Sequence, residues 1–293
     1  MRVGIISRRE DAWHTAELSK ELRRRSAEPF VFDFPDMVAR VGFGAPISAR
    51  GVDLLSEVAS IIVRPIGRGS LEEIIFSMDM LLTLSRRGLP IVNEPRAIEK
   101  CVDKYYALVT LEEAGLPVPR TVVCRSVERA LRAFDELGGD VVVKPIFGSR
   151  GMGMTRVSDR EVAWRVFSAL AFGRMVLYIQ EFVEHGNRDI RALVLDGEVI
   201  SSMYRVGGSW KTNIAQGARP VTVRLPEELQ ELAVRACEAV GCKLAGVDMI
   251  EAKDGRVLIV EVNSQPGWEG LQRVTKFSIA GRIAEYLIRI GRR

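Results

Sequence analysis

The first third of the chain alternates between short apolar runs and longer segments of helical periodicity. Apolar runs that are typical of strands occupy residues 2–7, 29–34, 59–65 and 90–93. Helical patterns follow the first run up to about residue 25 and occur again at 71–86. Because strands that alternate with helices usually pair in parallel, we expect a small open parallel sheet in this part of the chain.

The rest of the chain carries the patterns of mixed helices and hairpins. A helical stretch covers residues 95–115 and ends before two prolines. Strands and helices follow it, and the dipeptides Asp196-Gly197 and Asp254-Gly255 mark the turns of two hairpins. We therefore expect an α/β protein whose later part is of the α+β kind, with antiparallel sheets.

The second hairpin has a carboxylate where a buried strand should be apolar. Val, Leu and Ile dominate residues 257–263, yet Glu261 interrupts them, and an unpaired buried charge costs several kcal/mol, on the order of the Born penalty after relaxation. If Asp254 and Gly255 form a two-residue turn, the register places Asp248 directly opposite Glu261. Two carboxylates would then face each other.

A divalent cation would reconcile these two acids. Asn263 lies on the same strand face as Glu261 because side chains alternate with period two. Adjacent anions repel, whereas Mg²⁺ prefers a few carboxylate or amide oxygens and keeps positions for water and phosphate. The pattern predicts a magnesium site of Asp248, Glu261 and Asn263. The alternative is an exposed hairpin face with ordinary surface acids.

Two further segments suggest a phosphate-bearing ligand. Lys144 ends an apolar strand and a glycine-rich loop follows at 148–153, where glycine lets backbone N–H groups approach phosphate oxygens. The loop is not a Walker A motif, and a plain hairpin turn is the alternative. A strand that ends in Glu181-Phe182 can present its edge to adenine, and Asp189 and Arg191 share one face of the next strand. The alternative is a surface strand in which Asp189 and Arg191 form a salt bridge.

Composition narrows the class of protein. The chain has 293 residues, of which 47% are hydrophobic, with a net charge of +4 and a pI near 9.0. It has no long Lys/Arg block and no basic stripe with interleaved aromatics, which argues against a nucleic-acid groove and for small anionic ligands. No apolar run approaches the roughly 20 residues of a membrane helix, and the four cysteines show no zinc-site spacing and no disulfide framework. We expect a cytoplasmic protein with no nucleic-acid partner and no membrane partner.

Taken in order, these segments resemble the ATP-grasp superfamily, and most closely its RimK-like branch of amino-acid ligases. The resemblance spans roughly residues 90–290 in the segments AIEKCVDKYYALVTLEEAGLPVPRTVV, VVVKPIFGSRGMGM, QEFV, RDIRALV, WKTNIAQGA, AGVDMI and VEVNSQPGWEGLQRVTKFSIAGRIAEYLI. Their order makes it far more specific than any one motif. It implies two α+β subdomains that clamp ATP between antiparallel sheets. The expected division is an N-terminal domain at 1–94, a central subdomain with the glycine-rich lid at 95–180, and a C-terminal subdomain with the Mg²⁺ site at 181–293.

The resemblance also implies roles for individual residues. Lys104 and Lys144 match the paired lysines that reach ATP, and Glu181 and Phe182 match the strand that binds adenine through its backbone. The remaining positions implied for the nucleotide are Gly148, Ser149, Arg150, Gly151 and Gly153 in the lid, the acid Asp189, and Lys211, Thr212 and Asn213 in a phosphate- and substrate-side loop. Asp248, Glu261 and Asn263 match the family's magnesium ligands, in agreement with the hairpin register. We expect Arg191, Lys211 and Asn213 to serve catalysis, with Arg191 stabilising the oxyanion of the tetrahedral intermediate.

Such ligases activate a carboxylate with ATP and join it to an amine through an acyl phosphate. The resemblance implies ATP and Mg²⁺ as cofactors, with Mn²⁺ as a substitute. It further implies an amino acid, glutamate above all, a separate carboxylate acceptor and a homo-oligomer, either a dimer or a tetramer. The segments look nearer to members that modify a pterin or deazaflavin coenzyme than to those that modify a protein C-terminus or a carrier protein. A nucleotide-binding regulator without catalysis is the alternative from another class.

Overall fold

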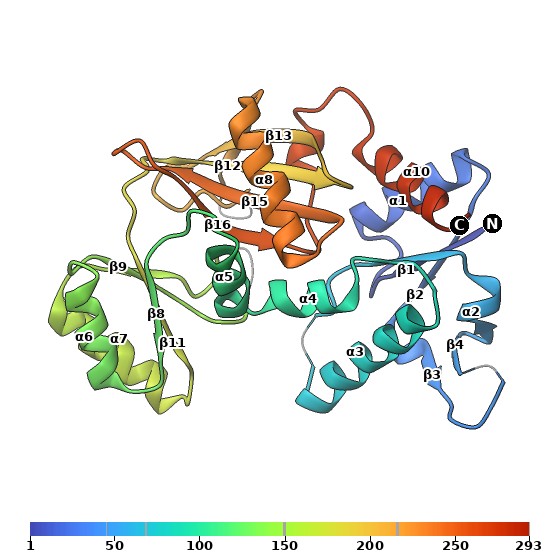
Figure 1. Ribbon diagram of the computed structural model, residues 1–293, viewed down its shortest axis with the longest axis horizontal. Coiled ribbons are helices and arrows are strands. Elements are labelled where there is room, and N and C mark those ends of the chain that lie inside the picture. Colours follow the sequence, from blue (N-terminus) through green and yellow to red (C-terminus); the bar gives the residue numbers. More distant parts are fainter. Residues whose placement is uncertain (45, 68, 149–150, 215–216, 293) are drawn as a thin grey trace.

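A computed structural model describes residues 1–44, 46–67, 69–148, 151–214 and 217–292 of the protein. The N-terminal unit is built on a parallel four-stranded sheet of order β2-β1-β6-β7 (Figure 1). Its strands are β1 (Arg2–Ile6), β2 (Glu28–Phe32), β6 (Ser60–Val63) and β7 (Ile91–Val92). The helices α1 (Trp13–Arg24) and α3 (Leu71–Arg86) bury one apolar side each. The predicted parallel sheet is confirmed.

A second, three-stranded sheet lies beside the parallel one and was not predicted. It is antiparallel, with the order β3-β4-β5. Its elements are short: the 3₁₀ turn η1 (Phe34–Asp36), β3 (Met37–Ala39), β4 (Ile47–Ala49), β5 (Val52–Asp53) and α2 (Leu54–Glu57). Strands of two or three residues are too short to show a period in the sequence, so only packing against the core of the N-terminal unit reveals them.

The central part of the chain forms a four-stranded antiparallel sheet of order β10-β9-β11-β8. The strands are β8 (Thr121–Cys124), β9 (Val141–Lys144), β10 (Thr155–Val157) and β11 (Leu177–Glu181). The helices α6 (Val127–Glu136) and α7 (Arg160–Phe172) pack together on this sheet and enclose a core with Phe134 and Phe167 (Figure 1). The helix α6 begins at the predicted cap, because Ser126 accepts a hydrogen bond from the Arg129 N–H.

The largest sheet has five antiparallel strands in the order β14-β13-β12-β15-β16. They are β12 (Arg188–Leu195), β13 (Glu198–Val206), β14 (Arg219–Thr222), β15 (Leu244–Glu251) and β16 (Val257–Asn263). The helices α4 (Pro95–Val102), α5 (Lys104–Glu113) and α8 (Glu227–Val240) share a core with this sheet. The short helix α9 (Glu269–Gln272) lies against β13 and β14. An α+β arrangement with antiparallel sheets is confirmed.

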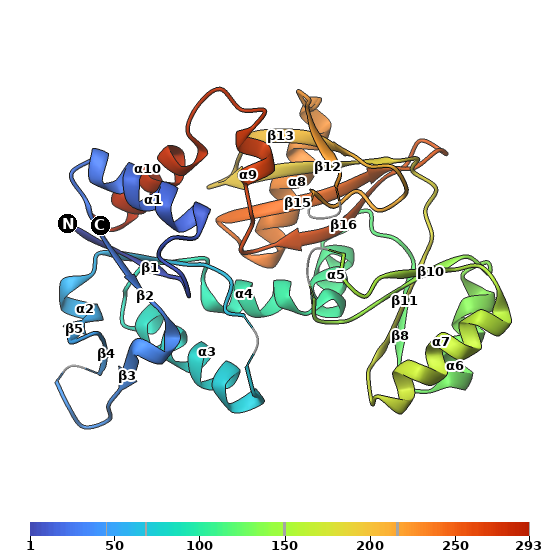
Figure 2. The same cartoon turned by 180° about the vertical axis from the view of Figure 1, so that it is seen from behind.

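Several segments cross the expected domain divisions. The helix α10 (Ile279–Ile290) ends the chain but packs beside α1 and β6, and Figures 1 and 2 show the two termini side by side. Asn93 also ties the units together, because its Nδ2 donates to the carbonyls of Leu244 (2.6 Å) and Ser264 (2.5 Å). One continuous core therefore joins the N-terminal sheet to the C-terminal one. The divisions at 94 and 180 stay predictions.

The hairpin of β15 and β16 places its acids as predicted, although the predicted two-residue turn is wrong. The N–H of Ala252 donates to Arg256 O (2.8 Å) and the N–H of Gly255 to Ala252 O (3.0 Å), so the loop is residues 253–255. Gly255 has φ +89°, which is the left-handed residue that such three-residue loops need. This loop shifts the pairing near the turn by one residue.

A β-bulge then restores the predicted register. Met249 pairs with Ile259, but Asp248 pairs with Glu261, so one extra residue sits in β16 between these pairs. Beyond the bulge Gly246 pairs with Asn263. The two deviations cancel, and Asp248 and Glu261 lie opposite each other on one face of the sheet.

Candidate active site

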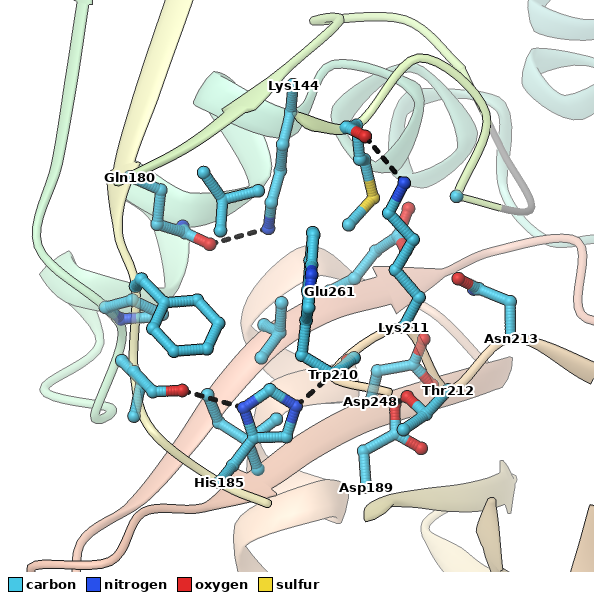
Figure 3. A pocket seen from close by; sticks show the side chains of 18 of the residues that line it. Lys144, Gln180, His185, Asp189, Trp210, Lys211, Thr212, Asn213, Asp248 and Glu261 are labelled. Atoms are coloured by element: carbon cyan, nitrogen blue, oxygen red, sulfur yellow. Dashed lines mark hydrogen bonds between the residues drawn. The ribbon is translucent and has the colours of Figure 1, made fainter. Parts of the chain in front are cut away.

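A pocket of about 110 Å³ lies between the central and C-terminal sheets. Its walls come from β9 and β11, from the glycine-rich loop after β9, from the loop after β13, and from β15 and β16. In Figure 3, Lys144, Lys211, Asp248 and Glu261 surround the same space. The pocket therefore gathers residues that are far apart in the sequence and that were predicted to bind one ligand.

Three lysines line this pocket, and each donates to an uncharged oxygen. Lys104 Nζ donates to Gly148 O (2.7 Å), Lys144 Nζ to Gln180 Oε1 (2.6 Å) and Lys211 Nζ to Met154 O (2.9 Å). Within the described ranges none of the three forms an ion pair with a carboxylate. Their positive charges are therefore available to a polyanion such as a nucleotide phosphate chain.

Lys144 is the most strongly perturbed of these lysines. Its side chain is buried on β9, and this burial lowers the pKa of Lys144 to about 8, with Glu261 raising it and Lys104 lowering it further. Gln180 holds the amine, and its own Nε2 donates to Thr121 Oγ1 (2.9 Å). Sequence reasoning missed Gln180, because only the pairing of β9 with β11 brings it beside the lysine.

Two arginines, Arg191 and Arg205, and two aspartates, Asp189 and Asp248, form a buried network at the floor of the pocket. Arg205 binds Asp189 through Nε (2.7 Å) and Nη2 (2.5 Å) and reaches Asp248 Oδ2 through Nη2 (3.1 Å). Thr212 donates to Asp189 Oδ2 (2.6 Å). Burial opposes the charge of Arg205, but the carboxylates of Asp248 and Asp189 raise its pKa. Arg205 was not predicted, and both carboxylate oxygens of Asp189 are occupied by these partners.

Glu261 retains free capacity to bind a cation, whereas Asp248 forms ion pairs with Arg191 and Arg205. Asp248 Oδ1 lies 2.9 Å from Arg191 Nε but forms no hydrogen bond, and it is buried. Glu261 lines the pocket and forms neither a hydrogen bond nor an ion pair with any described residue. No cluster of three His, Cys, Asp or Glu residues that could hold a metal is found in the described part of the chain. Two carboxylates and the Asn263 amide nevertheless fit Mg²⁺, which takes few protein ligands.

Arg191 lies beside Asp248 but does not line the pocket that holds the lysines. Burial lowers the pKa of Arg191, and Asp248 opposes that effect. The guanidinium covers Gly246, because a Cβ on that glycine would be 2.1 Å from Arg191 Nη1. Nη1 itself is buried and has no hydrogen-bond partner. Neither Arg191 nor Asn263 lines the lysine pocket, although each lies on a strand that contributes to it.

In the strand that was expected to bind adenine, the backbone N–H groups of Glu181 and Phe182 already donate to carbonyls of the protein. The N–H of Glu181 donates to Arg120 O and the N–H of Phe182 to Asp140 O, both at 2.9 Å. The Glu181 carboxylate pairs with Arg120 Nε (2.8 Å). The next residue, Val183, also lines this end of the pocket and was missed by sequence reasoning.

Aromatic rings close the same end of the pocket. Phe182 packs edge-on against Trp210 at a centroid distance of 5.9 Å and lies 6.1 Å from His185. His185 bridges Val183 O (2.7 Å) and Trp210 O (3.2 Å) through its two ring nitrogens (Figure 3). A pocket that combines these aromatic rings with three lysines suits a molecule with a planar base and a phosphate chain.

The glycine-rich loop and the loop after β13 face each other across the opening. Gly148, Gly151 and Gly153 have φ values of +150°, +69° and +77°, which only glycine adopts without strain. The predicted lid residues Ser149 and Arg150 lie outside the described residues. Lys211, Thr212 and Asn213 all line the pocket, so one loop contributes three of the predicted positions.

Comparison with known proteins agrees with the family resemblance of the sequence. The RimK-like ATP-grasp domain family matches residues 101–287. The tetrahydromethanopterin:alpha-L-glutamate ligase of Methanosarcina acetivorans is 34% identical, with 98% of each chain covered, and that of Methanocaldococcus jannaschii is 35% identical with the same coverage. The alpha-aminoadipate–LysW ligase LysX of Sulfurisphaera tokodaii is 35% identical over 68% of this chain and 70% of its own.

Solved structures show the same fold. The ATP-grasp ligase PsnB, solved with a minimal precursor, Mg and ADP, has a TM-score of 0.78 at 24% identity and covers 100% of this chain and 98% of its own. In addition, no described helix has the length and apolar character needed to cross a membrane. With the family match over residues 101–287 and full-length relatives above 30% identity, the chain belongs to the RimK-like ATP-grasp family of ligases.

Proposed function

We propose that this ligase joins the amine of L-glutamate to a carboxylate of a small coenzyme acceptor of the tetrahydromethanopterin class, at the expense of ATP. The full-length relatives that carry this activity in their names support the substrate class. One observation carries the chemistry: three lysines without carboxylate partners face Asp248 and Glu261 across one pocket.

The first step forms an acyl phosphate. A carboxylate oxygen of the acceptor attacks the γ-phosphorus of ATP, and the bond to the β–γ bridging oxygen breaks as ADP leaves. Lys104, Lys144 and Lys211 offset the negative charge of the phosphate oxygens while that bond breaks. Asp248, Glu261 and Asn263 would hold Mg²⁺, which supplies further charge neutralisation on the phosphates when bound.

The second step forms the amide. The glutamate amine attacks the acyl carbon and loses a proton, and the phosphate leaves with the electron pair of the carbon–oxygen bond. Arg191 Nη1 is a buried donor without an acceptor, so it can stabilise the oxyanion that develops at that carbon. Arg191 is in turn held beside Asp248, and this contact fixes its guanidinium next to the metal-binding carboxylates.

ADP release, measured with glutamate and a panel of acceptors, tests this function. We expect release to depend on ATP, on Mg²⁺, on glutamate and on a pterin-type acceptor, with the glutamylated product identified by mass. ATP binding without stimulation by any acceptor would instead favour the regulator, and stimulation only by a carrier protein would favour the second candidate below.

The second candidate is ligation of an amino acid to a carrier protein. LysX of Sulfurisphaera tokodaii supports it at 35% identity, but over 68% of this chain, against 98% for the tetrahydromethanopterin ligase of Methanosarcina acetivorans. The longer match to the tetrahydromethanopterin ligase supports the coenzyme acceptor. A homo-oligomer, a cytoplasmic location and Mn²⁺ as a substitute ion stay predictions.

A further inference from the structure

The parallel sheet of the N-terminal unit has a topological switch point between β1 and β6. From β1 the chain passes through α1 to β2 on one side, and it later returns to β6 on the other side of β1. Ligands of open α/β sheets bind outside the carboxyl ends of the strands at such a point. Here β6 is followed by Arg64, whose N–H donates to Ile6 O (2.9 Å) at the end of β1.

Arg64 is a buried cation without an anion. Its residue is 6% exposed, and burial lowers the pKa of its guanidinium to about 10. Nη1 donates to Pro266 O (3.0 Å), and the guanidinium carbon lies 4.7 Å from the centre of the Trp268 ring. No carboxylate of the described residues pairs with Arg64. Because a guanidinium has five N–H donors, most of them have no acceptor among the described residues.

A second buried donor beside Arg64 also lacks an acceptor. Trp268 is fully buried, and its Nε1 has no hydrogen-bond partner. The same residue donates its backbone N–H to His14 Nε2 (3.0 Å) in the first turn of α1. That helix has no side-chain cap at Ala12 and no acidic residue in its first turn, so its N-terminal N–H groups add positive potential. Donors therefore gather here without a matching anion.

Arg64 and Trp268 lie beside the proposed site of chemistry. A Cβ on Gly246 would be 2.1 Å from Arg191 Nη1 and 3.2 Å from Pro266 Cβ, so Pro266 separates Arg191 from Arg64. Gly246 is the cross-strand partner of Asn263. Gly246 and Pro266 therefore connect the neighbourhood of Asn263 and Arg191 to Arg64.

We propose that Arg64, Trp268 Nε1 and the start of α1, here called the switch-point cluster, bind a substrate carboxylate other than the one that is activated. This inference rests on the proposed function, in which glutamate brings two unreacting carboxylates and the acceptor can carry another. A charged carboxylate would satisfy Arg64 and the indole N–H together, and the adjoining Arg191 would hold the reacting carbonyl. The cluster thus selects anionic partners on the N-terminal side of the site.

A binding experiment on the full-length protein tests the cluster without turnover. L-glutamate and glutarate should raise the thermal midpoint of the wild type in the absence of ATP, whereas L-glutamine and glutarate diamide should raise it less. Arg64→Met keeps the apolar stem and removes the buried charge, and it should lose this response to the dicarboxylates. Trp268→Phe keeps a six-membered aromatic ring but loses the indole N–H together with the pyrrole ring, and it should weaken the response. Arg129→Met, on the exposed face of α6, is the matched control and should respond as the wild type does.

Steady-state kinetics then identify which substrate provides the carboxylate. In Arg64→Met the KM of one substrate should rise about 10- to 100-fold while the KM of ATP stays nearly unchanged, because a charged hydrogen bond is lost. A rise for glutamate assigns its carboxylate to the cluster, and a rise for the acceptor assigns the acceptor's. Equal dicarboxylate binding by wild type and Arg64→Met, no binding by the wild type, or a fall in kcat alone would overturn the proposal. Failure to release ADP with any acceptor would refute the proposed function and leave the binding result standing.

Discussion

Gly246 is the position where one added methyl group should separate chemistry from nucleotide binding. In Gly246→Ala the new Cβ would lie 2.1 Å from Arg191 Nη1 and 3.2 Å from Pro266 Cβ, whereas ordinary contact begins at 3.4 Å. The guanidinium must therefore move by about 3.4 − 2.1 = 1.3 Å. A misplacement of about 1 Å in a reacting group can cost about 100-fold in rate, so we expect kcat to fall by that order. Stability should fall by about 1–3 kcal/mol, as for other overpacked sites.

Three measurements separate this effect from unfolding. ADP release gives kcat, isothermal calorimetry gives the Kd of ATP, and urea denaturation gives the free energy of unfolding. The Kd of ATP should stay nearly unchanged, because neither Gly246 nor Arg191 lines the lysine pocket. Gly44→Ala is the matched control, since a Cβ there meets nothing within 4 Å. Full activity in Gly246→Ala would refute the role of Arg191, and equal loss of ATP binding would show that the effect is not local.

Four further predictions follow from the contacts of the pocket. Arg191→Met should abolish ligation and leave ATP binding, measured by calorimetry, nearly unchanged; loss of both together would count against an oxyanion role. Glu261→Gln should raise the Mg²⁺ concentration for half-maximal ATP binding by on the order of tenfold, with an unchanged thermal midpoint as the control. Arg205→Met leaves Asp189 as a buried carboxylate without a cation, so urea denaturation should show a loss of about 3–5 kcal/mol, and adding Asp189→Asn should recover part of it. Because the pKa of Lys144 is lowered from 10.5 to about 8, the free protein loses this charge as pH rises above 8, and ATP affinity should fall between pH 8 and 10. Lys144→Arg keeps its charge and should flatten that dependence; a flat wild-type profile would contradict the assignment.

The sequence carried enough local information to place the acidic pair of the site. The Asp-Gly signal and the alternation along β16 indicated that Asp248 and Glu261 share one face, and the structure pairs them. The turn was nevertheless predicted with one residue too few. A bulge beside Asp248 compensates for it, and the bulge has no sequence signature because it depends on how the two strands pair in the folded sheet.

The partners of the predicted site residues were decided by tertiary structure. Gln180, Arg205 and Val183 reach the pocket because strands pair across the chain, and pairing depends on packing rather than on local pattern. Asp189 was expected beside the nucleotide, but Arg205 and Thr212 occupy its carboxylate. A single sequence cannot show which of several arginines will find an aspartate.

The sequence by itself determined the class of fold and the alternation of strands and helices that builds the first sheet, because both follow from periodicity. It also determined the residue types of the pocket, because binding phosphate and a metal ion requires lysines and carboxylates. Only the tertiary structure decided that α10 returns to the N-terminal sheet, that Asn93 joins the two units, and that Arg64 and Trp268 meet near Arg191. Such contacts join residues hundreds of positions apart. Their stability comes from burying surface that no local stretch can bury alone, so only the assembled chain specifies them.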